Sequence, residues 1–186
     1  MMMPCGASTI IECSVRSALK ICTRVILVGG YRGAQLADAF DSWQKVVPVL
    51  NDAFDTGMFS SIKRGVELVR TQWFFLALGD MPLINPDVYH GLLDLALQPD
   101  LHTAEVFIPT FRERRGHPIL LSQSLATRIA GFDDSKTMRD VLADTETVHV
   151  PVADRHILTD VDNRQDYANM PKKNSGPTDA TIYQLR

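Results

Sequence analysis

Two groups of carboxylates in this sequence have the residue type and spacing to bind a divalent metal ion. Asp80 directly follows the apolar run of residues 73–79, in the stretch WFFLALGDMP. Asp160 and Asp162 alternate in TDVDN, so their side chains point to one side wherever that segment is extended. Mg²⁺ prefers oxygen ligands and shares them with substrate phosphates. A metal site built from both groups is therefore expected if the two segments reach the same edge of a sheet.

Each carboxylate also has a purely structural interpretation. Asp80 could accept hydrogen bonds from the turn that follows its strand, and local sequence alone favours this cap. Asp162 or Asn163 could cap a helix that is predicted to follow them in the stretch ILTDVDNRQDYANM. The presence of a second acidic group shifts the balance toward a metal site.

The stretch RERRGHP, residues 112–118, is the third candidate. Its arginines, Arg115 among them, could make forked contacts with an anionic ligand. Charge at the tip of a hairpin is more often solvated surface. His117 stands between Gly116 and Pro118, which fix its path, so it is a better candidate than a lone histidine usually is.

The fourth candidate is NDAFDTGMFSS, which begins at Asn51. Gly57, Ser60 and Ser61 introduce a helix whose N-terminal amides could bind phosphate, ribose or base edges. A loop followed by a serine-capped helix explains the same residues without a ligand. The glycines of LVGGYRG do not form G-x-G-x-x-G, and no acidic residue follows at the expected place, so a dinucleotide site is not expected.

Alternating strands and helices must position these residues. Apolar segments at 24–30, 46–51 and 73–80 predict buried strands, with Pro48 placing the second near an edge. Helical periodicity predicts helices that begin after Ser8 or Thr9, after Gly57 and after Asn85, the last with Pro86 at its first position. This order is typical of a doubly wound α/β sheet. Residues 104–122 predict two antiparallel strands, and Ser135 is the expected cap of a later helix.

Composition sets the limits of the interpretation. The 186 residues are 45% hydrophobic with net charge −3, which fits one α/β domain and gives no basic field for nucleic acid. No apolar run approaches the ~20 residues of a membrane span. The three cysteines have no C-x-x-C spacing, so we expect no disulfide framework or zinc site and a cytoplasmic location. Residues 1–170 are expected to form the domain, and the polar residues 171–186 a tail or linker.

Four segments, TGMFSSIKRGVE, LALGDMPLINPDV, RRGHPILLS and ILTDVDNRQDY, occur in the order found in a known family. The chain from residue 1 to about Tyr167 resembles the MobA-like NTP transferases, in particular the molybdenum cofactor cytidylyltransferases and molybdenum hydroxylase accessory proteins. The resemblance implies a Rossmann-like, three-layer nucleotidyltransferase fold, mostly parallel with an antiparallel addition. It also implies that Mg²⁺ assists the joining of CTP, or another NTP, to the phosphate of molybdopterin, with release of pyrophosphate.

The resemblance assigns roles to residues that match the family motifs. Asp80 matches the metal-binding Asp of G-D-M-P, and Asp160 and Asp162 fall on the late D-x-D segment near metal and phosphates. We therefore expect Asp80 and Asp162 to act in catalysis. The late motif is looser than the family's D-x-D-T-P-x-D-Y. Residues expected to bind the nucleotide or the pterin are Asn51, Gly57, Ser60, Ser61, Arg115 and His117, the last nearer the pterin.

One departure from the family affects both fold and function. The family's first strand and its loop L-A-A-G-x-S-x-R-M-G, with the Lys that follows, have no counterpart in this sequence. We expect the first strand to be missing, leaving a gap or an unpaired edge that favours poor solubility or dimerisation. Two alternatives to a cytidylyltransferase stay open: a non-catalytic accessory protein that binds the cofactor or a molybdenum hydroxylase, and a related transferase acting on another small phosphate.

Overall fold

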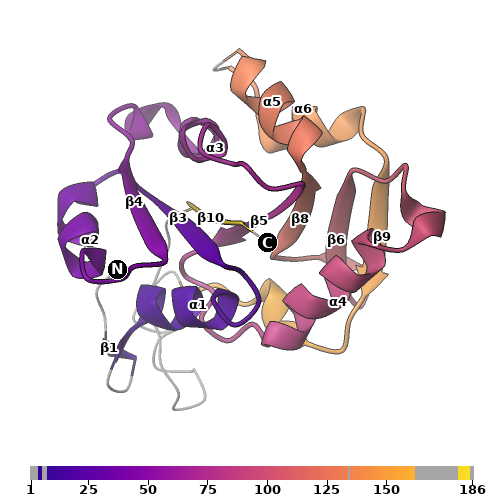
Figure 1. Ribbon diagram of the computed structural model, residues 1–186, viewed down its shortest axis with the longest axis horizontal. Helices are drawn as coiled ribbons and strands as arrows, with labels where there is room; N and C mark the ends of the chain where they lie inside the picture. The colour runs from indigo at the N-terminus through magenta and orange to yellow at the C-terminus, as the bar shows by residue number, and fades with distance from the viewer. Residues whose placement is uncertain (1–3, 6–7, 134, 162–179, 185–186) are drawn as a thin grey trace.

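The computed structural model describes residues 4–5, 8–133, 135–161 and 180–184, and Figure 1 shows its layers. A sheet of eight strands has the order β4-β3-β10-β5-β8-β6-β7, and β9 pairs with β6. Helices α1, α2 and α4 cover one face of the sheet, and α3, α5 and α6 cover the other. The predicted α/β fold with a mixed sheet is therefore confirmed.

The first half of the chain alternates helices with strands as predicted. Strands β3 and β4 pair in parallel, and β4 lies at the end of the sheet, which confirms that Pro48 belongs to an edge strand. A short antiparallel hairpin of β1 and β2 precedes them. The elements are β1 Pro4–Cys5, β2 Ser8–Thr9, α1 Ile10–Ala18, β3 Arg24–Gly29, α2 Gly33–Phe40, β4 Val46–Leu50, the 3₁₀ helix η1 Phe54–Thr56, α3 Met58–Val66, β5 Trp73–Leu78 and α4 Pro86–Ala96.

The second half adds antiparallel strands, again as predicted. Strand β8 pairs with β5 and with β6, so β6 runs parallel to β5. A tight hairpin joins β6 to β7, with Arg112 and Glu113 both at positive φ. The elements are the 3₁₀ helix η2 Pro99–Leu101, β6 Val106–Phe111, β7 Arg114–Arg115, β8 Ile119–Ser122, α5 Gln123–Gly131, α6 Met138–Ala143, β9 Thr147–Pro151, the 3₁₀ helix η3 Arg155–Leu158 and β10 Ala180–Gln184.

Side-chain caps fix where the helices begin. Thr9 and Glu12 form a reciprocal capping box at α1, and Asn85 accepts a hydrogen bond from the amide of Asp87 at the start of α4. Both starts agree with the prediction. The expected cap at Ser135 is wrong, because α6 begins later and Thr137 forms its capping box with Asp140.

Strand β10 corrects the expectation of a gap in the sheet. It lies between β3 and β5, where the resemblance implied a missing parallel strand, and pairs antiparallel with both. Within the expected polar tail, residues 180–184 thus form a central strand. Each neighbour gains backbone hydrogen-bond partners that an unpaired edge would lack. The domain boundary at residue 170 stays a prediction.

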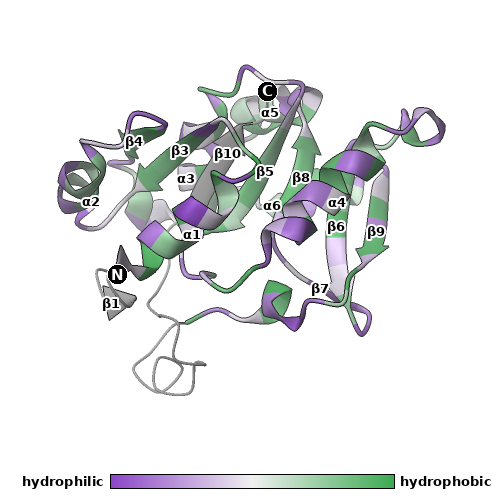
Figure 2. Cartoon of the chain, turned by 60° about the horizontal axis from the view of Figure 1, so that its bottom comes forward, coloured by the Kyte–Doolittle hydropathy of each residue, from purple (hydrophilic) through white to green (hydrophobic). Residues whose placement is uncertain are grey.

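The core consists of two apolar layers, one on each face of the sheet. Figure 2 shows the hydrophobic residues concentrated along β3, β5 and β8, with hydrophilic residues on the outer sides of the helices. Phe75 packs edge-on against Tyr89 of α4 in one layer, and Phe74 belongs to the other layer. This alternation explains why β5 is apolar on both faces.

The cysteines and the lengths of the helices can also be compared with what the sequence predicted. Cys13 is disulfide-bonded, although the number and spacing of the cysteines predicted no disulfide framework. Cys22 is a buried free thiol, and burial raises its pKa far above the usual range, which leaves it protonated. In the part of the chain that the structure describes, no helix is long and apolar enough to cross a membrane.

Candidate functional site

Four strands bring the candidate segments to one edge of the sheet. Strands β4, β5, β6 and β9 all run in the same direction, as the registers with β3, β10 and β8 show. The segments after their carboxyl ends begin with Asn51, with Gly79 and Asp80, with the hairpin of residues 112–118, and with residues 152–160. Ligands bind at this edge of open α/β sheets. The sequence prediction of a shared edge is therefore supported by the topology.

Asp80 is almost fully buried in the turn after β5, with 1% of its surface exposed. Helix α1 fixes this turn from one side: Ser14 Oγ donates to the carbonyl oxygen of Gly79 at 2.9 Å, and Ser17 Oγ donates to that of Ile84 at 2.8 Å. The backbone N–H of Asn85 donates to Asp154 Oδ2 at 2.9 Å from the other side. The carboxylate therefore sits in a turn held at both ends, which suits a preorganised ligand.

His117 connects β5 and β8 to the segment that carries Asp160. Its backbone N–H donates to the carbonyl oxygen of Ile157 at 2.9 Å, and its Nδ1–H donates to that of Leu76 at 3.4 Å. Burial lowers the pKa of His117, while the hydrogen bond to Leu76 and the carboxylate of Asp160 act in the opposite direction. Desolvation is the larger effect, so the neutral imidazole is favoured beside the exposed Asp160.

Gly116 is required for this contact. A Cβ atom at residue 116 would lie 2.3 Å from the carbonyl oxygen of Ile157, well inside van der Waals distance. The absence of a side chain lets β8 and η3 come together at this edge. Close packing against Ile157 therefore explains why the residue before His117 is a glycine.

Asn51 organises the second group of predicted residues. It is buried, its Nδ2 donates to Ser60 Oγ and to Ser61 Oγ at 2.9 Å each, and its Oδ1 accepts from the amide of Ala53 at 3.1 Å. Gly57 has φ of 117°, a conformation that favours glycine, and leads into α3 without a side-chain cap. The structure thus brings Asn51, Ser60 and Ser61 together around a helix start whose first amides have no capping side chain.

Two further predicted site residues are Arg115 and Asp162. Arg115 is exposed on β7, where it pairs with Thr110 on the hairpin. Asp162 lies outside the described residues. The role of each stays a prediction.

The metal prediction can be compared with the donors present. The described ranges contain no group of three or more His, Cys, Asp or Glu side chains arranged to hold a metal ion. Mg²⁺ usually takes one or two carboxylates and completes its coordination with water and substrate phosphates. Asp80 and Asp160, two carboxylates on segments that leave the same edge, have the donor chemistry for such a site.

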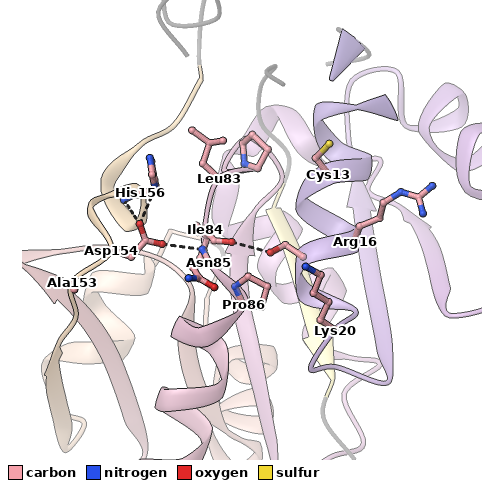
Figure 3. Close-up of a pocket in the computed structure, with 12 residues that line it drawn as sticks. Cys13, Arg16, Lys20, Leu83, Ile84, Asn85, Pro86, Ala153, Asp154 and His156 are labelled. Atoms are coloured by element: carbon pink, nitrogen blue, oxygen red, sulfur yellow. Dashed lines mark hydrogen bonds and ion pairs between the residues drawn. The ribbon is translucent and has the colours of Figure 1, made fainter. Parts of the chain in front are cut away.

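A cleft of about 880 Å³ adjoins this edge and contains residues that sequence reasoning missed. Asp154 and His156 line it, and His156 Nδ1 donates to Asp154 Oδ1 at 2.8 Å (Figure 3). The spacing D-x-H at residues 154–156, just after strand β9, was the available signal in the sequence. It was weak, because only the turn at η3 brings the two side chains together.

Comparison with known proteins agrees with this geometry. A family model described as the MobA-like NTP transferase domain matches residues 1–150. The molybdenum cofactor cytidylyltransferase of Escherichia coli K12 is 29% identical over 167 residues, which cover 90% of this chain and 84% of that protein.

Solved structures share the fold at lower identity. A Mycobacterium tuberculosis H37Rv protein crystallised with manganese has a TM-score of 0.68 and 19% identity, over 90% of this chain and 88% of that one. A nucleotidyl transferase from Methanothermobacter has a TM-score of 0.67 and 20% identity, over 90% and 81%. At these identities the likeness shows the fold alone.

Proposed function

Because the chain belongs to the MobA-like NTP transferase family, and so to the nucleotidyltransferases of molybdenum cofactor biosynthesis, we propose that it transfers CMP from CTP to molybdopterin. The observation that carries this choice is the 29% identity with the Escherichia coli molybdenum cofactor cytidylyltransferase over 90% of the chain. The gathering of the matched motif residues at one edge of the sheet supports it.

The proposed reaction is a displacement at the α-phosphorus of the nucleotide. An oxygen of the molybdopterin phosphate forms the new P–O bond, the bond from the α-phosphorus to the bridging oxygen breaks, and pyrophosphate leaves. The nucleophile is already an anion at neutral pH, so no general base is needed. Positioning and charge neutralisation then provide most of the acceleration.

In this proposal the residues that bind the nucleotide lie on one side of the edge of the sheet, and the residues that hold the metal lie on the other. The loop held by Asn51 and the uncapped start of α3 at Gly57, Ser60 and Ser61 form the nucleotide side of the proposal. The turn held by α1 places Asp80, and the contact of His117 with Ile157 places the Asp160 segment on the other side. This arrangement supports a site in which substrate lies between α3 and η3.

A divalent cation fits the proposal. Asp80 and Asp160 would hold it, with Asp162 as the further candidate, and bound cations neutralise charge that develops on transferring phosphates. The manganese in the Mycobacterium tuberculosis structure belongs to that protein and makes a divalent metal reasonable here.

A direct test measures pyrophosphate release from the purified chain with molybdopterin and each of CTP, GTP, ATP and UTP in turn, with Mg²⁺ present. We expect release with CTP that depends on molybdopterin. Preference for another nucleotide would correct the base, and release with a different phosphorylated acceptor would favour the related transferase. Hydrolysis of CTP independent of any acceptor would contradict the proposal.

Strand β10 favours a second candidate, the accessory protein. A strand that runs antiparallel to β3 and β5 cannot lead from its carboxyl end into a phosphate loop at the candidate site, because that end lies at the opposite edge. A protein of this kind would bind the cofactor or a molybdenum hydroxylase without transfer. Binding of molybdopterin with no pyrophosphate release from any nucleotide would support it.

A further inference from the structure

We propose that Asp154 is a positioning residue for the metal site. Its carboxylate joins the segment that carries Asp80 to the segment that carries Asp160, and so holds two carboxylates where one divalent cation can bind both. The inference rests on the proposed function for the presence of the cation. Asp154 lies outside the four segments on which the family resemblance depends, and its role comes from its contacts.

Both oxygens of the Asp154 side chain accept hydrogen bonds. Oδ2 accepts the backbone N–H of Asn85 at 2.9 Å, and Oδ1 accepts the backbone N–H of His156 at 2.9 Å and its Nδ1–H at 2.8 Å (Figure 3). The side chain is 14% exposed. Three N–H donors thus engage a carboxylate that is largely withdrawn from water, which suits a fixed link between segments better than a metal ligand.

The bond to Asn85 completes the attachment of the turn that follows β5. Helix α1 holds the start of this turn, because Ser14 Oγ donates to the carbonyl oxygen of Gly79. The end of the turn is held at Asn85 by Asp154. Asp80 is buried between these two attachments, so its carboxylate keeps its place while both of them hold.

The same carboxylate begins the segment that leads to Asp160. Asp154 is the N-cap of η3, since it accepts the backbone N–H of His156. Ile157 of η3 is fully buried, and its carbonyl oxygen accepts the backbone N–H of His117. Asp160 comes shortly after the end of η3, so its position depends on where η3 is fixed.

The spacing between the two segments decides whether one cation can reach both carboxylates. Mg²⁺ demands near-ideal octahedral geometry with oxygens at about 2.0–2.1 Å, so a small shift of either segment removes a ligand. Residues that orient metal ligands commonly contribute about 10- to 100-fold to metal affinity. Asp154 acts through the backbone of the two segments and not on the ligand atoms, so we expect an effect at the lower end of this range.

The test measures binding of Mn²⁺, which takes the same oxygen ligands as Mg²⁺, from the electron paramagnetic resonance signal of the free ion. It needs neither nucleotide nor turnover. We expect Asp154→Ala to raise the Kd for Mn²⁺ about 10-fold. Asp154→Asn lacks the charge but keeps an oxygen that can accept the N–H of Asn85. Its Kd should therefore lie between those of the unaltered chain and Asp154→Ala.

A second pair of variants removes the link without changing any charge. Asn85 has φ of −66°, an angle that proline adopts, so Asn85→Pro deletes the N–H donor at an allowed backbone conformation. Asn85→Ala is the matched control, because it loses the same side-chain cap of α4 and keeps the N–H. We expect Asn85→Pro to bind Mn²⁺ about 10-fold more weakly than Asn85→Ala. The thermal midpoint checks that each variant is folded, and either pair decides alone if a member of the other does not fold.

Three results would overturn the proposal. Equal Kd values in Asn85→Pro and Asn85→Ala would show that the link does not affect the metal site. Equal losses in Asp154→Ala and Asp154→Asn would show that Asp154 acts through its charge or binds the cation itself. Absence of Mn²⁺ binding by the unaltered chain would remove the metal site. Weaker Mn²⁺ binding in Asp154→Ala and in Asn85→Pro, each relative to its partner variant, would uphold the proposal even if the chain released no pyrophosphate from any nucleotide.

Discussion

The backbone N–H of His117 donates to the carbonyl oxygen of Ile157 at 2.9 Å, and this bond joins strand β8 to the segment that carries Asp160. It links two of the candidate motifs, which lie about forty residues apart in the sequence. The glycine before His117 makes the approach possible, as the short distance from a residue-116 Cβ to Ile157 shows.

The first prediction concerns this contact. Gly116→Ala forces a Cβ to within 2.3 Å of a backbone oxygen, so η3 must shift. We expect the free energy of unfolding in urea to fall by about 1–3 kcal/mol. Gly91→Ala is the matched control, because a Cβ there meets no atom within 4 Å, and it lies inside α4. The control should be neutral or slightly stabilising; equal destabilisation of both variants would remove the special role of Gly116.

A second prediction concerns the loop on the nucleotide side. Asn51→Ala removes two donated hydrogen bonds and one accepted bond from a buried position. We expect a loss of about 1–3 kcal/mol in the free energy of unfolding, together with a higher KM for the nucleotide. Asn51→Asp keeps the acceptor for the amide of Ala53. Its free energy of unfolding should therefore lie between those of Asn51→Ala and the unaltered chain. An unchanged KM in Asn51→Ala would separate this loop from nucleotide binding.

Acid should weaken the fold through His117. Burial lowers its folded-state pKa below the ordinary 6.5, so the unfolded chain takes up the proton first as pH falls. The stabilisation from the neutral ring is thus complete above about pH 6.5 and is lost as pH falls through that value. Urea unfolding at pH 7.5 and 5.5, in buffer with a chelator, should show this difference.

The histidine variants isolate that effect. His117→Asn should reduce the loss of unfolding free energy between the two pH values, whereas His149→Asn, at an exposed position on β9, should leave it unchanged. If His117→Asn lost as much stability on acidification as the unaltered chain, the pH dependence would have to come from other groups.

The central strand β10 gives a fourth prediction. Ile182 pairs with Ile26 of β3 and Leu76 of β5, so Ile182→Pro removes a donor and inserts a ring in the middle of the sheet. We expect a loss of about 3 kcal/mol or more in unfolding free energy, with aggregation through the exposed strands. Ile182→Val keeps the amide N–H and should lower the free energy of unfolding far less. Equal thermal midpoints for the two variants would show that residues 180–184 do not hold the sheet together.

Much of the first half of the fold was predictable because its signals are local. The Thr9 cap, the apolar run of β5 and the Asn85–Pro86 helix start all depend on neighbouring residues. Strand β10 was not predictable, since TIYQ in a polar segment carries no signal for a place in the central sheet; only pairing with β3 and β5 gives it one. Helix α6 is capped by Thr137 and not by Ser135, because Thr137 forms a reciprocal capping box with Asp140.

The candidate site was predictable in part for the same reason. Asn51, Ser60 and Ser61 lie within one loop and helix start, so the sequence brings them close. The approach of His117 to Ile157 and the pairing of Asn85 with Asp154 depend on the packing of β8 and η3, which no periodicity in the chain reveals. Catalytic roles for Asp80 and Asp162 stay predictions.

The central claim is that this chain transfers a nucleotide at a metal held by Asp80, and one measurement tests it most directly. Pyrophosphate release from CTP with molybdopterin and Mg²⁺ is compared between the unaltered chain and Asp80→Asn, with the thermal midpoint of each as the check on folding. We predict release by the unaltered chain and a loss of at least about 100-fold in Asp80→Asn, since the charge that holds the cation is removed. Equal rates in the two folded proteins, or no release by the unaltered chain, would contradict the account.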